Sequence, residues 1–133
     1  MKANHSLYFD GCSLKNPGIS GSGSVIYYKD EEIWSKSTFL SECGTNNEAE
    51  YLGLLEGLKK AKLMEIKKLK VYGDSMLIIK QMKGEYNVNA KNLKPFYLKC
   101  KELEKYFEFI EYNHVYREYN ERADYLSKQA TNL

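Results

Sequence analysis

The stretch GTNNEAEYLGLLEGLKKAKLM, residues 44–64, decides the fold. Its apolar residues recur with the period of an α-helix, and Leu54, Gly57, Leu58 and Ala61 fall on one stripe. The small polar residues at its start can cap exposed backbone amides, which is typical of a helix N-terminus. The stretch therefore predicts a long helix that buries one face.

Strand-like segments flank this helix on both sides. HSLYFD (residues 5–10) precedes it, and KKLKVYGDS (67–75) follows it. A strand, helix, strand order implies a parallel pair of strands joined by a crossover. Two more strands are expected within residues 23–40 around the turn KDEE, and NPGISGSG (16–23) is typical of a turn-rich connection. We therefore predict an α/β fold in which helices cover a mixed sheet.

The last third of the chain continues this alternation. The sequence predicts a short helix within residues 75–86, a longer helix after Pro95, and a strand near 107–116. A final helix is expected to open around Asn120, which is a suitable cap.

Composition predicts one globular domain over residues 1–133. The net charge is only +2, and the lysines are crowded among compensating acids, so charge alone indicates a polyanion partner only weakly. Cys12, Cys43 and Cys100 are odd in number and scattered, which favours neither a disulfide framework nor a zinc site and suits a reducing, intracellular, cytoplasmic setting. The sequence shows neither a secretory h-region nor a membrane span. We expect a monomer.

Two strands end in an aspartate. Asp10 follows the first apolar strand and Asp74 follows the strand after the long helix, so parallel pairing brings them together at the carboxyl ends where α/β sheets bind ligands. Glu50 falls on the apolar stripe of the helix, and no lysine or arginine shares that face in this stretch. An unpaired inward carboxylate is costly, and a metal ion would resolve the cost.

Other acids have simpler interpretations. Glu48 lies on the far side of the helix from Glu50, and Glu56 faces Lys60 at i+4, so both are expected to be solvated. Asp124 is expected in the first turn of the final helix, where the helix dipole favours an acid in any case. Its position alone leaves a chemical role open.

Four motifs in order resemble those of the type 1 ribonucleases H, which cut the RNA strand of RNA/DNA hybrids. They are DGCSLKNPG (10–18), TNNEAEY (45–51), VYGDS (71–75) and REYNERADYL (117–126), and the likeness runs from Leu7 to about Ala130. The resemblance implies a ribonuclease H-like fold, a five-stranded mixed sheet of three antiparallel and then two parallel strands. It also implies that residues 1–133 are a single catalytic domain.

By the same resemblance, the metal-binding catalytic carboxylates fall on Asp10, Glu50, Asp74 and Asp124. Two Mg²⁺ ions are implied, with Mn²⁺ a possible substitute, because phosphodiester hydrolysis needs an activated water and a stabilised leaving oxygen. Asp10 would bridge the ions, Glu50 and Asp74 would hold the ion on the leaving-group side, and Asp124 the ion that activates the water.

Substrate contacts follow from the resemblance as well. Asn16, Asn46 and Asn47 match positions that touch the hybrid, Thr45 matches a residue that seats a phosphate of the DNA strand, and Gly11 would let the substrate backbone come close. The segment GTNN also suits a helix cap, and both roles can hold at once.

The chain departs from the best-studied pattern in three places. Residues 83–94 are too few for the basic protrusion of some members, and Met76 replaces a common glutamine. The histidine-containing loop before the last aspartate is missing, so Arg117 or Glu118 is expected to take over part of its work, and His114 is interpreted as structural.

Two other classes of protein remain open. One is a catalytically weak or inactive nucleic-acid-binding module of the same fold. The other is a different nuclease of the superfold, such as an exonuclease, although such enzymes carry an acid where this chain has Cys12.

Overall fold

In the computed structural model, which describes residues 3–132, three strands come first and helices then alternate with two more strands. The elements are β1 (His5–Ser13), β2 (Gly18–Tyr28), β3 (Glu31–Gly44), α1 (Asn46–Leu63), β4 (Lys68–Gly73), α2 (Met76–Met82), α3 (Lys94–Glu104), β5 (Phe109–His114), the 3-10 helix η1 (Arg117–Tyr119) and α4 (Glu121–Ala130).

The strands form one sheet in the order β3-β2-β1-β4-β5. The pairs β1–β2 and β2–β3 are antiparallel, whereas β1–β4 and β4–β5 are parallel. This confirms the predicted mixed sheet, including the parallel pair that α1 connects.

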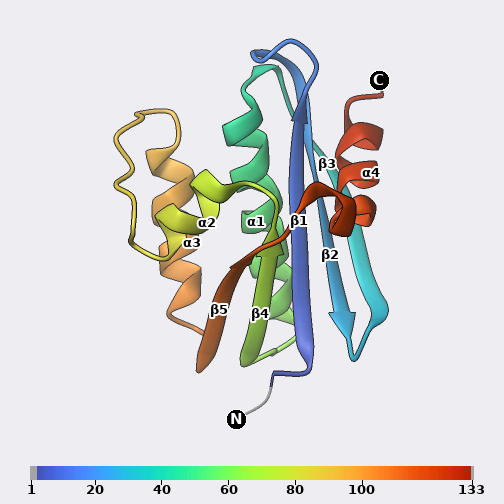
Figure 1. Cartoon of the computed structure of the whole chain (residues 1–133), viewed down its shortest axis with the longest axis vertical. Coiled ribbons are helices and arrows are strands. Elements are labelled where there is room, and N and C mark those ends of the chain that lie inside the picture. Colours follow the sequence, from blue (N-terminus) through green and yellow to red (C-terminus); the bar gives the residue numbers. More distant parts are fainter. Residues whose placement is uncertain (1–2, 133) are drawn as a thin grey trace.

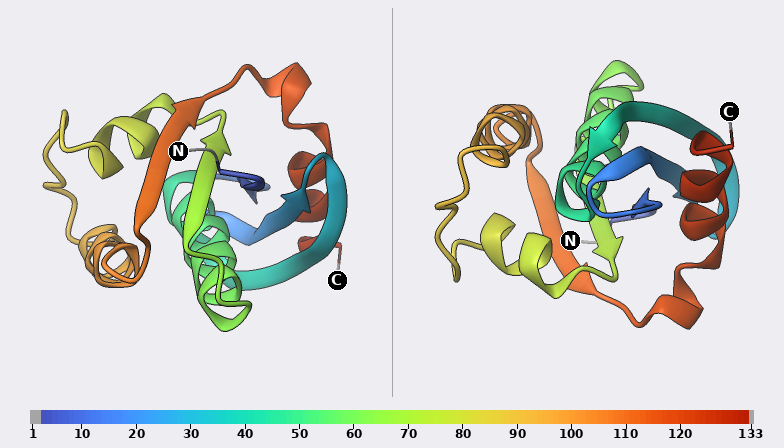
Figure 2. Two further views of the ribbon diagram at one scale, coloured as in Figure 1. Left: turned by 90° about the horizontal axis from the view of Figure 1, so that it is seen from below. Right: turned by 90° about the horizontal axis from the view of Figure 1, so that it is seen from above.

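Helices cover the two faces of this sheet unequally. Figures 1 and 2 show α1, α2 and α3 on one face and α4 on the other, within the curve of the sheet. The larger core lies under α1, where Leu7, Phe9, Leu54 and Leu58 are fully buried. Within residues 3–132, no helix has both the length and the apolar character that crossing a membrane requires.

A capping box fixes the start of α1. The Thr45 side chain accepts from the Glu48 N–H at 3.1 Å, and the Glu48 carboxylate accepts from the Thr45 N–H at 2.8 Å. Two amide groups that the helix leaves unpaired are thereby satisfied. The predicted cap at GTNN is confirmed, and α1 begins where the sequence indicates.

The turn-rich connection predicted for residues 16–23 is wrong beyond Pro17, because β2 begins at Gly18. A Cβ added at Gly21 would lie 2.4 Å from the Ala130 Cβ, and one at Gly23 would lie 2.2 Å from the Ala123 carbonyl oxygen. The glycines therefore let α4 pack directly on the backbone of β2. A composition typical of a loop here serves close packing within a strand.

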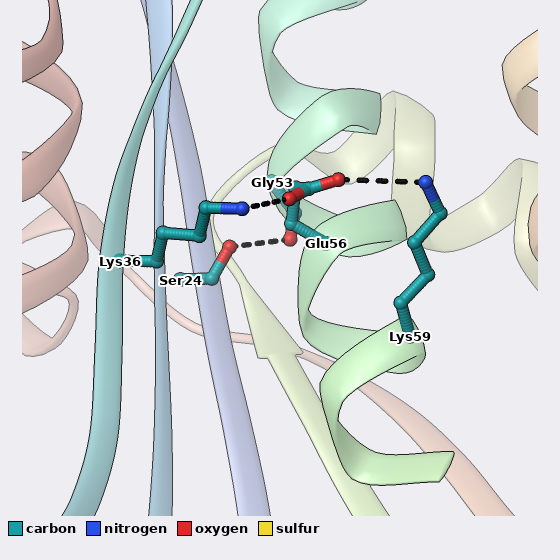
Figure 3. A network of polar contacts seen from close by, with 5 residues as sticks. All are labelled: Ser24, Lys36, Gly53, Glu56 and Lys59. Carbon is teal, nitrogen blue, oxygen red and sulfur yellow. Dashed lines mark hydrogen bonds and ion pairs between the residues drawn. The ribbon is translucent and has the colours of Figure 1, made fainter. Parts of the chain in front are cut away.

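Glu56 joins α1 to the edge strand β3, so its predicted pairing with Lys60 is wrong. Its carboxylate lies 2.6 Å from the Lys36 Nζ and 3.6 Å from the Lys59 Nζ (Figure 3). Beside this pair, the Ser24 hydroxyl donates to the Gly53 carbonyl at 2.6 Å. The Glu56 side chain is only 14% exposed, so it is less solvated than predicted, although the Lys36 and Lys59 side chains are 48% and 54% exposed.

Asn120 joins α4 to β1. Its side chain makes no hydrogen bond that caps α4, contrary to the prediction, and its Nδ2 instead donates to the Phe9 carbonyl at 2.9 Å. Asn120 is only 2% exposed. Because Phe9 precedes Asp10, this buried bond fixes the start of α4 beside Asp10 on the first strand.

We predict that Asn120→Ala lowers the free energy of unfolding by about 1–3 kcal/mol, because it leaves the buried Phe9 carbonyl without its donor. Urea denaturation followed by circular dichroism measures the change. The control Gln129→Ala, on the exposed side of the same helix, should change stability by no more than about 0.5 kcal/mol. Equal losses in both variants would contradict the assignment.

Candidate active site

Asp10 lies within β1, one residue beyond the last pairing of β1 with β4, and the predicted strand end at Asp10 is wrong because β1 continues to Ser13 in pairing with β2. Its side chain is 4% exposed, and its Oδ1 accepts from the Gly11 N–H at 2.9 Å. Leu7 and Phe9 face the core, as the strand alternation predicts, so Asp10 projects from the opposite face.

Glu50 reaches the same place from α1, which lies very close to β1 here. A Cβ added at Gly11 would lie 2.2 Å from the Glu50 nitrogen and 2.4 Å from the Ala49 carbonyl carbon. Only glycine allows this approach, so Gly11 has a packing role that sequence reasoning missed. The Glu50 side chain is buried, as the helical period predicts.

Asp74 follows directly on β4 and completes a group of three carboxylates. Oxygens of Asp10, Glu50 and Asp74 all lie within 4.8 Å of one another. The parallel pairing of β1 with β4 therefore brings Asp10 and Asp74 together, and α1 adds the glutamate.

The electrostatics of this carboxylate group are unfavourable without a cation. Burial, and then the charge of Asp74, raises the pKa of Asp10 from 3.8 to about 7. Burial, and then the charges of Asp10 and Asp74, raises the pKa of Glu50 well above its usual value. The Oε2 of Glu50 is buried and has no hydrogen-bond partner. An unpartnered carboxylate oxygen among like charges fits a hard divalent cation.

Asp124 lies beside this group without being one of the three. It is close enough to Asp10 to contribute to the raised pKa of Asp10. Its Oδ2 forms an ion pair at 3.0 Å with Lys128, and its side chain is 22% exposed. The i, i+4 spacing of Asp124 and Lys128 is the sequence signal for this pair.

Comparison with known proteins agrees with this arrangement. The family model described as "Reverse transcriptase-like" matches residues 8–130. Ribonuclease HI of Halobacterium salinarum is 35% identical over 123 residues, which cover 92% of this chain and 62% of that protein. The chain belongs to the type 1 ribonuclease H family.

Solved structures of the family match closely in shape. The N-terminal RNase H domain of Rv2228c from Mycobacterium tuberculosis superposes with a TM-score of 0.93 at 31% identity, covering 98% of this chain and 95% of that one. LC11-RNase H1 in complex with an RNA/DNA hybrid gives 0.90 at 32% identity, with 96% of each chain covered. The chain spans 62% of the length of the Halobacterium protein and 34% of the Mycobacterium tuberculosis bifunctional protein Rv2228c, so it corresponds to one part of these relatives.

In this chain, the residues expected to touch substrate gather where the β1–β2 connection meets the start of α1. Asn16 Oδ1 accepts from the Asn46 N–H at 2.9 Å, and Asn46 Oδ1 accepts from the Ser13 N–H at 2.8 Å. Because a backbone N–H can bond only to the oxygen of each carboxamide, both Nδ2 groups are the free ends. Asn47 is exposed beside them, and the Thr45 hydroxyl accepts the capping bond described above.

The segment between β5 and α4 lies on the other side of Asp74. Arg117 and Glu118 are exposed residues of η1, and Arg117 lines an open pocket together with Asp74 and His114. His114 is the last residue of β5, pairs with Gly73 and stacks edge-on with Tyr116 at 5.7 Å. Sequence reasoning interpreted His114 as structural and missed its place beside Asp74, which the parallel β4–β5 pairing brings about.

The region between α2 and α3 confirms that this member is compact. Residues 83–93 contain turns and no further helix, so the basic protrusion of some relatives has no counterpart in this part of the chain.

We predict that Asp10→Asn stabilises the metal-free protein at pH 8. Because the pKa of Asp10 is raised on folding from 3.8 to about 7, ionising Asp10 destabilises the native state increasingly as the pH rises between these values. Asparagine removes that cost, so the variant should exceed wild type by at least about 1 kcal/mol at pH 8 and match it near pH 4. Urea unfolding in EDTA at both pH values measures the difference, and a variant less stable than wild type at pH 8 would contradict it.

Proposed function

We propose that this chain is an endonuclease that hydrolyses the RNA strand of RNA/DNA hybrids with the help of divalent metal ions. The observation that carries the proposal is the convergence of Asp10, Glu50 and Asp74 within 4.8 Å, in a chain of the ribonuclease H family. A relative of the same shape was solved with an RNA/DNA hybrid, which supports the choice of substrate.

Asp10, Glu50 and Asp74 would hold Mg²⁺, and Mn²⁺ is a possible substitute. Their oxygens are the hard ligands that both ions prefer. Asp124 is proposed as a fourth ligand, which would complete a site for two ions. Its carboxylate would then leave its ion pair with Lys128 and bind the metal instead. Bound ions of this kind activate water and neutralise charge on the phosphate.

The contribution of the protein is to hold these carboxylates in place before substrate arrives. Glu50 is fixed by the rigid helix α1, and Asp10 is held by its bond from the Gly11 N–H. Burial keeps competing water away from both groups, which strengthens their interaction with a cation. The arrangement is therefore prepared for metal at the cost of repulsion in its absence.

We further propose that the free Nδ2 groups of Asn16 and Asn46, together with Gly11, Thr45 and Asn47, contact the hybrid. The exposed donors suit 2′-hydroxyl and base-edge acceptors in the shallow minor groove of an A-like duplex. Arg117 and Glu118 are proposed as auxiliary groups, because Arg117 lines the pocket beside Asp74.

Domain organisation and setting complete the proposal. Residues 1–133 would form one catalytic domain that acts as a monomer inside the cell, where Cys12, Cys43 and Cys100 stay reduced.

A cleavage assay with matched glutamine variants tests the proposal. The substrates are a labelled RNA/DNA hybrid, duplex DNA and each single strand, with and without Mg²⁺. We expect cutting only of RNA within the hybrid and only with metal. Glu50→Gln should lose more than about 100-fold in rate, since even outer partners of metal ligands cost about 10–100-fold.

Glu48→Gln is the matched control, because it makes the same change two residues earlier on the same helix. Glutamine can still serve in the capping box, so this variant should keep activity within about threefold. Equal activity of the two variants, or equal cutting of duplex DNA, would overturn the assignment.

A further inference from the structure

Strand β4 carries a line of polar and aromatic side chains that leads to the carboxylate group. Its residues Leu69 and Val71 belong to the core under α1. By strand alternation, Lys70 and Tyr72 lie on the opposite face, and Asp74 continues their line. Two residues of a strand rise by about 6.6 Å, so Tyr72 lies one such step from Asp74 and Lys70 lies two.

This part of the sheet face is open. Helix α4 packs on β1, β2 and β3, and in Figure 1 no helix of residues 3–132 lies in front of the lower halves of β1 and β4. Two adjoining hollows of about 210 and 340 Å³ lie here and share Ser6 and Asp30. Lys70 and Tyr72 line the larger one, whose volume is within the range of roughly 300–1,000 Å³ that is typical of ligand pockets.

Tyrosine rings form a stack across three strands on this face. The rings of Tyr8 and Tyr72 stack with their centres 4.8 Å apart and 16° between their planes, and Tyr27 stands edge-on to Tyr8 at 5.5 Å. Neighbouring strands are also about 4.8 Å apart, so the stack runs from strand to strand. Tyr27 closes its end on β2, whereas its end at Tyr72 borders the larger hollow. Another planar ring can extend the stack there.

Lysines without ion-pair partners lie beside the rings. Among residues 3–132, no carboxylate lies within ion-pair distance of Lys29, Lys68 or Lys70. Lys29 lines the larger hollow, and Lys68 extends the line of β4 beyond Lys70. The acids nearby are Asp30, which lines both hollows, and Glu111, which pairs with Lys70 across the sheet. Three amines and two acids leave a small excess of positive charge.

We propose that this open face, formed by Tyr8, Tyr27, Lys70 and Tyr72, binds a single-stranded extension of the RNA strand that occupies the carboxylate group. Bases would stack on the tyrosine rings and the lysines would pair with phosphates, a combination that holds single strands with little regard to sequence. The inference rests on the proposed function, since it adds a second contact for the same strand.

Continuity with the carboxylate group favours this occupant. An RNA strand that leaves Asp74 along β4 meets the ring of Tyr72 and then the amine of Lys70, at intervals of about 6.6 Å. A duplex fits less well, because its bases are already stacked and paired with one another. An apolar protein segment also fits less well, because the rings are half-buried and bordered by charges rather than by a continuous apolar surface.

Fluorescence anisotropy of the full chain in EDTA tests this binding without hydrolysis. The probe is a labelled single-stranded RNA of about ten nucleotides, within the usual site sizes of such surfaces. An abasic oligomer with the same number of phosphates offers no rings, so it should bind at least about tenfold more weakly. The affinity for the RNA should fall as salt is raised, because phosphate contacts contribute to it.

Tyrosine variants separate stacking from other causes. Tyr72→Ala should weaken binding of the probe by at least about tenfold, because it removes the ring at the open end of the stack. Tyr72→Phe keeps the ring and should stay within about threefold of wild type. The control Tyr86→Ala removes a tyrosine that is 47% exposed between α2 and α3, and it should change the affinity by less than about twofold.

A charge reversal tests the lysines in the same way. Lys70→Glu should weaken binding by at least about fivefold, because it replaces attraction by repulsion. Lys99→Glu makes the same change on α3, which covers the other face of the sheet, and should have less than about a twofold effect. Amide shifts in NMR spectra of the wild-type chain give a readout without mutation, and RNA should move residues 6–8, 27–30 and 68–72.

Hybrids with an RNA extension connect the open face to the proposed function. In EDTA, an extension at one end of the RNA strand should tighten binding by at least about tenfold over the blunt hybrid, and Lys70→Glu should lose this gain. With Mg²⁺, Lys70→Glu should hydrolyse the blunt hybrid at the wild-type rate. Failure of the wild-type chain to hydrolyse any hybrid would overturn the proposed function, whereas loss of the extension effect alone would overturn only this inference.

Three further results would also overturn the inference. The abasic oligomer could bind as tightly as the RNA, or Tyr72→Ala and Tyr86→Ala could lose equal affinity. The third is a shift of residues 68–72 on dilution without RNA, which would show that a second copy of the chain covers this face.

Discussion

Three carboxylates within 4.8 Å of one another, two of them buried, are the constraint on which the rest of the structure depends. Each loses hydration and each repels the others, so the group can persist only where packing elsewhere provides the compensating free energy. The apolar contacts of α1 with the sheet, through residues such as Leu54, Leu58 and Phe9, lie directly beside the group and supply that compensation. The raised pKa values of Asp10 and Glu50 reflect the residual cost, which a bound cation would remove.

The close approach of α1 and α4 to the backbone of β1 and β2 positions the carboxylates of the candidate site. The two helices on either side of β1 and β2 are in contact with strand backbone and not only with side chains. A Cβ on Gly53 of α1 would lie 2.8 Å from the Asp10 carbonyl oxygen, and one on Gly23 of β2 would lie 2.2 Å from the Ala123 carbonyl oxygen. Together with the Asn120 bond to Phe9, these contacts hold α1 and α4 at fixed distances from Asp10. Glu50 and Asp124 are positioned by the same contacts, because they lie on those helices.

Much of this arrangement could be predicted from the sequence, because it depends on local periods. The helical period selected Glu50 and not Glu48, and the strand, helix, strand order brought Asp10 and Asp74 together, although β1 continues beyond Asp10 to Ser13. The errors involve partners far apart in the chain. The sequence around Gly21 and Gly23 predicts a loop, because the packing of α4 on these glycines cannot be seen from it. Asn120 is predicted as a cap, because its hydrogen bond to the distant Phe9 carbonyl cannot be seen either. The pairing of Glu56 with Lys36 likewise depends on β3, which no pattern within α1 could reveal.

At both ends of α1, helix structure explains some of the exposed or charged residues but not all of them. Lysines in the last turn of a helix are favoured by its dipole, so Lys60 and Lys62 need no partner to explain their presence. That explanation does not extend to Leu63, because an apolar side chain that is 77% exposed contributes nothing to the dipole and little to the core. At the other end, Glu48 satisfies the cap while Glu50 satisfies nothing within the protein. Helix structure thus explains Lys62 but not the adjacent Leu63, and it explains Glu48 but not Glu50. At the N-terminal end of α1, the residue without a partner is the one that lies within the carboxylate group.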